Sequence, residues 1–165
     1  MADVKLNITL NKPQLKTYRV AGKTLKEAKK ALDARGEWGL YDATPNFKSS
    51  AQVDADGNVR VVNIELNPVI ELPAWAGYGA ATKAQKASWD AMFKALKAHE
   101  LKHHDIQDDC VEDLRKALLA AKTLDADTMN DLIEAAQKAA QKKQEAYDSR
   151  SGHGAKEGVV LDLDA

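Results

Sequence analysis

The feature of this sequence that most restricts its fold is a long segment without glycine or proline. Neither residue occurs between Gly79 and Gly152, where the composition shifts to Ala, Lys, Leu and Glu. Glycine and proline are the residues that most strongly interrupt helices, so residues 80–147 are predicted to be helical. A break is expected near residues 123–128, where Thr128 resembles an N-cap, and the segment therefore predicts two long helices packed as a hairpin.

The preceding part of the chain, residues 1–75, has mainly strand patterns. Apolar and polar side chains alternate over residues 4–10, which is the period-two pattern of a half-buried strand. An Asp56-Gly57 step lies between two further strand-like runs, and this dipeptide is typical of hairpin turns. A sheet with at least one hairpin is therefore expected in this half.

One short helix interrupts the strands. Thr24 and Glu27 have the spacing of a capping box, and Gly36 is a suitable helix end. Strands followed by helices predict an α+β fold, with an antiparallel sheet packed against the long two-helix hairpin. We expect a single domain over residues 1–165, in which residues 148–165 form a loop and a short final strand.

Composition and charge exclude several classes of function. The 24 Lys and Arg residues nearly balance the 25 Asp and Glu residues and are dispersed among them, which argues against nucleic-acid binding. No apolar run approaches the roughly 18 residues of a membrane span. Cys110 is the only cysteine, so a metal site would need His, Asp or Glu ligands. The oligomeric state is not indicated.

The strongest functional motif is His99-Glu100-Leu101-Lys102-His103, a His-Glu-x-x-His sequence within the first predicted long helix. Both histidines lie on an apolar stripe, so both rings are expected to face inward on adjacent turns, where they can bind one metal ion. Glu100 lies about 100° around the helix, within reach of a water on that metal. The stripe consists of Trp89, Met92, Phe93, Leu96, Ile106, Cys110, Leu114 and Leu118.

A catalytic zinc site needs a third protein ligand, and His153 is the first choice. It has glycine on both sides, which allows the backbone to approach closely and direct the ring toward the helix. Glu134 and Asp108 are weaker alternatives. His104 is expected near the site or in solvent, because it points off the apolar stripe. Two core histidines without a metal are the competing interpretation.

Tyr147 is a second candidate for a catalytic role. It lies at the end of the second predicted helix, six residues before His153, where its phenol can donate a hydrogen bond to an oxyanion. A tyrosine at a helix end more often packs with its hydroxyl in water, which is the alternative.

The chain also resembles a family of bacterial zinc-dependent proteases of poorly known function, the domain of unknown function 922. The resemblance implies a zincin-like zinc peptidase, strengthens His153 as third ligand and favours a role for Tyr147, although Ser151 replaces the family's usual Thr. The family is predicted to be secreted; because no leader precedes the first strand, we expect a cytoplasmic protein or one whose leader was removed. The resemblance rests on Tyr18–Gly22, Trp38, Tyr41–Thr44, Leu72–Trp75, Trp89, Phe93, His99, Glu100, His103, Tyr147, Asp148 and Ser151–Gly154.

These observations predict a Zn2+-dependent metalloendopeptidase that acts on a peptide or protein substrate. Glu100 would act as general base and Tyr147 would stabilise the oxyanion. One strand of the Asp56-Gly57 hairpin, for example residues 59–66, could be an edge that holds an extended substrate by strand addition. The alternatives are a non-catalytic zinc-binding domain and a protein-interaction module formed by the helical hairpin.

Overall fold

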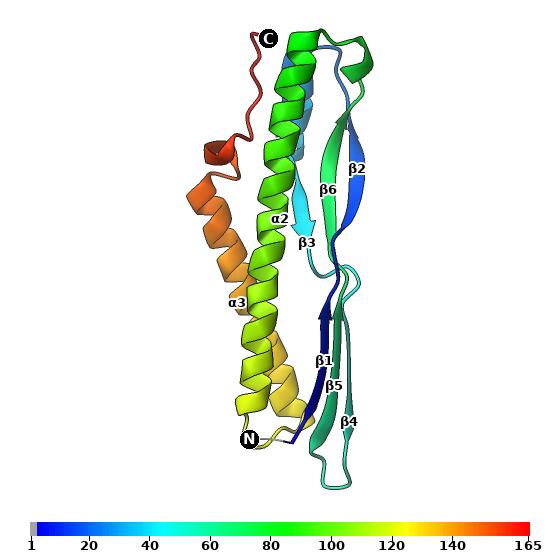
Figure 1. Cartoon of the computed structure of the whole chain (residues 1–165), viewed down its shortest axis with the longest axis vertical. Coiled ribbons are helices and arrows are strands. Elements are labelled where there is room, and N and C mark those ends of the chain that lie inside the picture. Colours follow the sequence, from blue (N-terminus) through cyan, green and yellow to red (C-terminus); the bar gives the residue numbers. More distant parts are fainter. Residues whose placement is uncertain (1–2) are drawn as a thin grey trace. The chain divides into compact units, whose positions relative to one another are not determined.

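The computed structural model of the chain describes residues 3–165 (Figure 1). The chain forms two compact units, each with its own three-stranded sheet and its own apolar core. The first unit comprises residues up to Pro13, Ala43–Pro68 and His104–Glu145. The second unit comprises Gln14–Asp42, Val69–His103 and Ala146–Ala165.

The sheet of the first unit has β5 (Val59–Leu66) in the centre, between β1 (Lys5–Leu10) and β4 (Lys48–Val53). β4 and β5 are antiparallel and form the expected hairpin. Gly57 in their turn has φ +82°, a conformation that glycine adopts without steric cost. β1 pairs with β5 in parallel and shows the alternating exposure that its sequence predicts.

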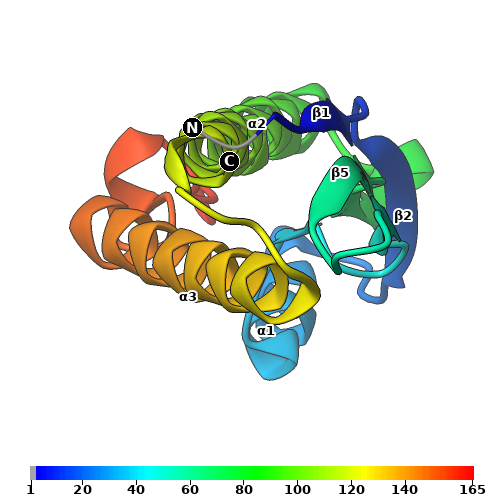
Figure 2. The ribbon, with the colours of Figure 1, turned by 90° about the horizontal axis from the view of Figure 1, so that it is seen from below.

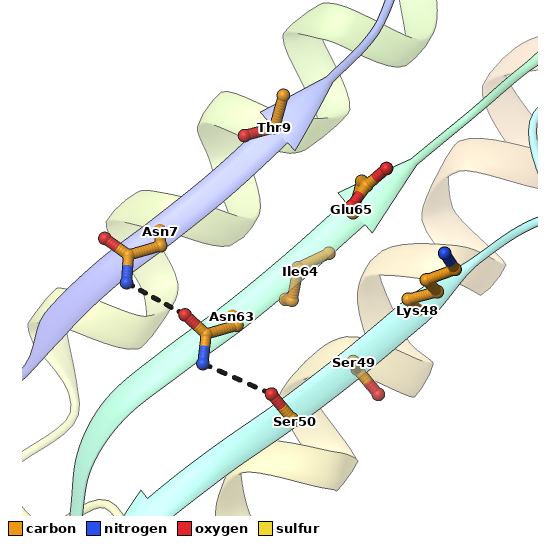
Figure 3. A pocket seen from close by; sticks show the side chains of 8 residues that line it. All are labelled: Asn7, Thr9, Lys48, Ser49, Ser50, Asn63, Ile64 and Glu65. Carbon is orange, nitrogen blue, oxygen red and sulfur yellow. Dashed lines mark hydrogen bonds between the residues drawn. The ribbon is translucent and has the colours of Figure 1, made fainter.

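A row of polar side chains crosses the exposed face of this sheet (Figure 3). The Asn7 amide donates to Asn63 Oδ1 at 2.8 Å, and the Asn63 amide donates to Ser50 Oγ at 3.2 Å. These residues line a shallow pocket, but their polar groups bond to one another across three strands. We therefore infer that these side chains have a structural role, because cross-strand pairs of this kind fix the register of the strands and stabilise a sheet.

Two long helices follow the strands. α2 (Lys83–Ala120) contributes residues to both units, and α3 (Ala126–Ser151) begins after the short connection 121–125 (Figure 2). The Asp125 carboxylate accepts a hydrogen bond from the Thr128 N–H at 2.7 Å, so the helix starts before the predicted N-cap. None of the helices in the described part of the chain has the length and apolarity of a membrane span.

The core of the first unit lies between its sheet and these helices. It is formed by strand residues such as Val62 and Ile64, and by helical residues such as Leu114, Leu118 and Ile133. Burying apolar side chains of this size contributes about 1.5–3 kcal/mol each, so this contact is the main stabilising interaction of the unit.

The sheet of the second unit has β6 (Val69–Trp75) in the centre, between β2 (Gln14–Val20) and β3 (Leu40–Asp42). α1 (Leu25–Arg35) connects β2 to β3 and begins with the predicted capping box, in which Thr24 and Glu27 bond each other's backbone. The core of this unit joins α1, β2, β6 and the first part of α2, and it includes Leu32, Ile70 and Met92.

The α+β class is confirmed, but the prediction of one antiparallel sheet is wrong. β1 pairs with β5 and β2 pairs with β6 in parallel, while only β3 and β4 run antiparallel to their neighbours. A parallel pair needs a long crossover connection, and here that connection contains α1 and the strands β3 and β4. Strand signals along the sequence do not show which distant strands will pair.

The short strand expected at the end of the chain does not form. Residues 159–161 have no strand partner, and the 3-10 helix η2 (Ala155–Glu157) precedes them. Gly158 has φ +96°, which breaks the extended path, and Val159 is buried in the core of the second unit. Of the apolar residues that suggested a strand, Val159 is a core side chain and Leu161 packs against the core, whereas Val160 is exposed.

Candidate metal centre

The His-Glu-x-x-His motif lies within α2, in the part that belongs to the second unit. His99, Glu100 and His103 are only 4%, 3% and 6% exposed. The two histidines are four residues apart, which places their rings on adjacent turns of one helix face. Three ionisable groups are therefore held in the interior of the unit by a helix that no glycine or proline interrupts.

Asp148 of α3 completes a group of three possible metal ligands. Its Oδ1 atom lies 3.1 Å from His99 Nε2 and 2.9 Å from His103 Nε2. The two Nε2 atoms are 3.3 Å apart. Three ligand atoms from two helices thus converge on one point.

These spacings suit a zinc ion. Tetrahedral zinc with ligands at about 2.0–2.2 Å separates its ligand atoms by roughly 3.3–3.6 Å. The separation of the two Nε2 atoms falls at the lower end of that range, and the carboxylate oxygen is slightly closer to both. Two imidazoles and one carboxylate are also a ligand set that catalytic zinc sites use. The residues present therefore fit a zinc ion with one further coordination position.

Aromatic rings enclose the two histidines. The Tyr147 ring is stacked on His99 with centroids 4.8 Å apart, and it meets His103 edge-on at 5.0 Å. Tyr41 of β3 is stacked on the His103 ring at 6.3 Å. Close packing of this kind limits the rotation of the imidazoles, so their orientation is set before any ligand binds.

Glu157 contacts the other nitrogen of His99. Its Oε1 atom accepts a hydrogen bond from His99 Nδ1 at 2.9 Å, and the Tyr147 hydroxyl donates to both carboxylate oxygens at 2.8 and 2.9 Å. Burial opposes the charged form of Glu157, but the hydrogen bonds from His99 and Tyr147 outweigh it and lower the pKa of the carboxyl. Burial and the same contact with Glu157 raise the pKa of Tyr147.

Glu100 is held beside the histidines by β3. Its carboxylate accepts a hydrogen bond from the backbone N–H of Tyr41. Burial, with the negative charges of Asp148 and Glu37, raises the pKa of Glu100 to about 8. Carboxylates gathered in this way repel one another, and a bound cation would relieve that repulsion.

Comparison with known families gives one match, which spans most of the chain. Residues 15–154 match the family described as "Bacterial protein of unknown function (DUF922)". The chain belongs to this family. No curated protein and no solved structure matches the chain. Membership in DUF922 agrees with the resemblance seen in the sequence, and the description of the family assigns no activity.

In this DUF922 chain, His153 is not part of the group of possible ligands. Its side chain is exposed and its backbone has φ +52°, while its N–H donates to the Asp148 carbonyl at 2.8 Å. The group of possible ligands contains Asp148 and not the predicted His153. Asp148 is among the residues that carry the family resemblance, but its spacing in the sequence does not indicate a metal ligand.

Of the two glycines around His153, Gly154 brings the backbone close to α2, as expected. A Cβ atom at Gly154 would lie 3.3 Å from His99 Cγ and 2.6 Å from Val159. The side chain of this turn that contacts His99 is the carboxylate of Glu157, and not the imidazole of His153. No pattern in the sequence marks Glu157, because nothing distinguishes it from the other acidic residues of the chain.

The weaker candidates lie outside the group of possible ligands. Asp108 is exposed, and Glu134 is exposed and pairs with Lys138 at 2.6 Å. His104 is half-buried, and burial lowers its pKa. All three belong to the first unit, and the group of ligands found among residues 3–165 contains none of them.

Proposed function

We propose that this DUF922 protein is a zinc-dependent hydrolase, and specifically a metallopeptidase that cleaves peptide or protein substrates. The observation that supports this most strongly is the convergence of His99 Nε2, His103 Nε2 and Asp148 Oδ1 within 3.3 Å of one another. Three protein ligands with one open position are typical of catalytic zinc, whereas structural zinc usually has four.

His99, His103 and Asp148 would hold the ion. When bound at such a site, zinc polarises a carbonyl group and lowers the pKa of water from 15.7 to about 7. That chemistry suits amide hydrolysis near neutral pH. The enclosure of the histidines by Tyr147 and Tyr41 keeps the ligand atoms in place without the ion, so little reorganisation is needed on binding.

Glu100 is the proposed general base. It follows His99 on α2, and its buried carboxylate is fixed by the Tyr41 N–H, so it is separate from the ligands but adjacent to them. In this role Glu100 accepts a proton from the attacking water and passes it to the leaving amine. Burial and the neighbouring negative charges raise the pKa of Glu100 to about 8, and a cation bound beside it would favour the carboxylate form that a base requires.

The substrate-binding strand expected from the sequence needs a correction. β5 (Val59–Leu66) pairs on both sides, with β1 and with β4, and so it is not an edge strand. The other strand of the hairpin, β4, is an outer strand, but it belongs to the first unit, whereas the proposed metal ligands belong to the second. β3 is an outer strand of the sheet in the second unit, and its Tyr41 contacts both His103 and Glu100. We therefore place an extended substrate beside β3, where its scissile bond would be near the metal ligands.

Two measurements test the proposal. Elemental analysis of protein purified without chelator or immobilised metal should give one zinc per chain. Wild type should then cleave unstructured protein such as denatured casein, and Glu100→Gln should bind zinc normally while losing at least about 100-fold in rate, the contribution typical of a general base. A zinc-free wild type that takes up no metal on titration would exclude the hydrolase. Zinc binding without cleavage of any protein or peptide tested would favour the non-catalytic alternative.

A further inference from the structure

We propose that Glu157 is a positioning residue, which fixes the tautomer and orientation of His99 so that Nε2 is presented to the metal. The inference rests on the proposed metal site. It extends that site by two residues: Glu157, which contacts His99, and Tyr147, which holds Glu157. Neither residue belongs to the group of three possible ligands, and both contact His99.

The hydrogen bonds of His99 support this role. A neutral imidazole carries one proton, and only the nitrogen without it can bind a metal. The Glu157 carboxylate only accepts hydrogen bonds, and it lies 2.9 Å from Nδ1. Asp148 Oδ1 also lies 3.1 Å from Nε2, but it is closer to His103 Nε2, at 2.9 Å. The shorter contact with Glu157 therefore favours the proton on Nδ1, which leaves the lone pair of Nε2 available to a metal. Metal-binding histidines in general have such a partner on the second nitrogen.

The turn after α3 places Glu157 through a set of backbone bonds. The Gly154 N–H donates to Ser151 Oγ at 3.2 Å, and the Glu157 N–H donates to the Gly154 carbonyl at 2.9 Å. The Val159 N–H donates to the same carbonyl at 3.1 Å, and the Val159 side chain is buried. The Glu157 side chain is 41% exposed, but hydrogen bonds before and after residue 157 fix the backbone that carries it.

Tyr147 gives Glu157 a single orientation. Its hydroxyl donates to both carboxylate oxygens, while its ring is stacked on the same His99 that Glu157 contacts. In this arrangement Tyr147 holds Glu157, a role that the sequence did not suggest; the oxyanion role stays a separate prediction. Tyr147, Glu157 and His99 form one closed triangle of contacts, so the loss of either partner leaves the imidazole less constrained.

The first test is proton NMR of the metal-free protein. Wild type should show a downfield resonance for the hydrogen-bonded Nδ1 proton of His99, assigned by its loss in His99→Ala. Glu157→Ala should abolish this resonance, and Tyr147→Phe should shift it. An unchanged resonance in Glu157→Ala would overturn the proposal, whether or not the protein binds zinc.

The second test is zinc affinity, measured by competition with a chromophoric chelator. Glu157→Ala should bind zinc about 10–100-fold more weakly, as is typical when the partner of a metal-binding histidine is removed. Glu157→Gln keeps an acceptor oxygen and should lose less, and Glu112→Gln, an exposed residue of α2 paired with Arg115, should match wild type. Equal affinities for wild type and Glu157→Ala would overturn the positioning role. A wild type that binds no zinc would instead contradict the proposed function, and the NMR result would then stand by itself.

Discussion

Gly39 lies directly against the carboxylate of Glu100. A Cβ atom at residue 39 would be 2.6 Å from Glu100 Oε1, which is far closer than two such atoms can approach. Gly39 is buried, and its backbone φ is not in the left-handed region. Glycine therefore serves here for space rather than for backbone conformation, and the space is occupied by the proposed general base and by Leu96, whose Cδ1 would lie 2.9 Å from the added Cβ.

Gly39→Ala should therefore impair hydrolysis while leaving metal binding intact. The new methyl group displaces the Glu100 carboxylate, but His99, His103 and Asp148 keep their positions. We expect at least a ten-fold loss in kcat/KM with near-normal zinc affinity, and a stability cost of about 1–3 kcal/mol from overpacking. Rate assays, zinc titration and thermal unfolding measure the three effects.

Gly79→Ala is the matched control for this substitution. A Cβ at Gly79 meets no atom within 4 Å, and this glycine also has no positive φ. Its kinetics and zinc affinity should equal those of wild type. If Gly39→Ala hydrolysed substrate as fast as Gly79→Ala, Glu100 would not be the base or would not need its observed position.

Asp148→Asn should abolish tight zinc binding, whereas His153→Ala should not. The amide lacks the negative charge of the carboxylate and coordinates zinc poorly, so we expect more than about 100-fold weaker binding, beyond the roughly 10–100-fold typical of outer partners. The exposed ring of His153 contributes nothing to the group of ligands. Isothermal titration with Zn2+ compares the two variants directly, and the opposite ranking would restore His153 as the third ligand.

Removal of zinc should destabilise the folded chain. A ligand that binds only the folded state stabilises it by about 2.7 kcal/mol at a concentration 100 times its Kd. A chelator should therefore lower the thermal midpoint of wild type, and excess Zn2+ should restore it. Asp148→Asn should show no response to either addition. A wild-type midpoint unaffected by chelator would argue against a stoichiometric metal.

The part of the site that could be predicted is the part that one helix supplies. His99, Glu100 and His103 are positioned by helical periodicity alone, and the same periodicity showed that the two histidines face the interior. The capping box at Thr24 and the turn at Gly57 are likewise local, and both occur as predicted. Short-range geometry is fixed by neighbours in sequence, which a single sequence displays.

The rest depends on contacts between distant segments. Asp148 is 45 residues from His103, and Glu157 is 58 residues from His99. The turn 152–158 decides which side chain meets His99, and its glycines indicated a close approach but not the residue delivered. The parallel pairing of β2 with β6 is equally non-local. Such features follow from packing of the whole unit, which patterns within short windows do not encode.

Ionisation of Tyr18 should make the protein less stable at alkaline pH. Its hydroxyl donates to the Trp38 carbonyl at 2.6 Å, next to Gly39, and burial raises its pKa to about 12 from an ordinary value of 10.0. The neutral phenol is thus favoured by folding, so its contribution is complete below pH 10 and is lost as the pH rises toward 12. Tyr18→Phe cannot ionise, and the difference in unfolding free energy between wild type and this variant should shrink steadily over that interval in urea titrations. A difference that stays constant from pH 9 to 12 would show that the Tyr18 proton is not held by the fold.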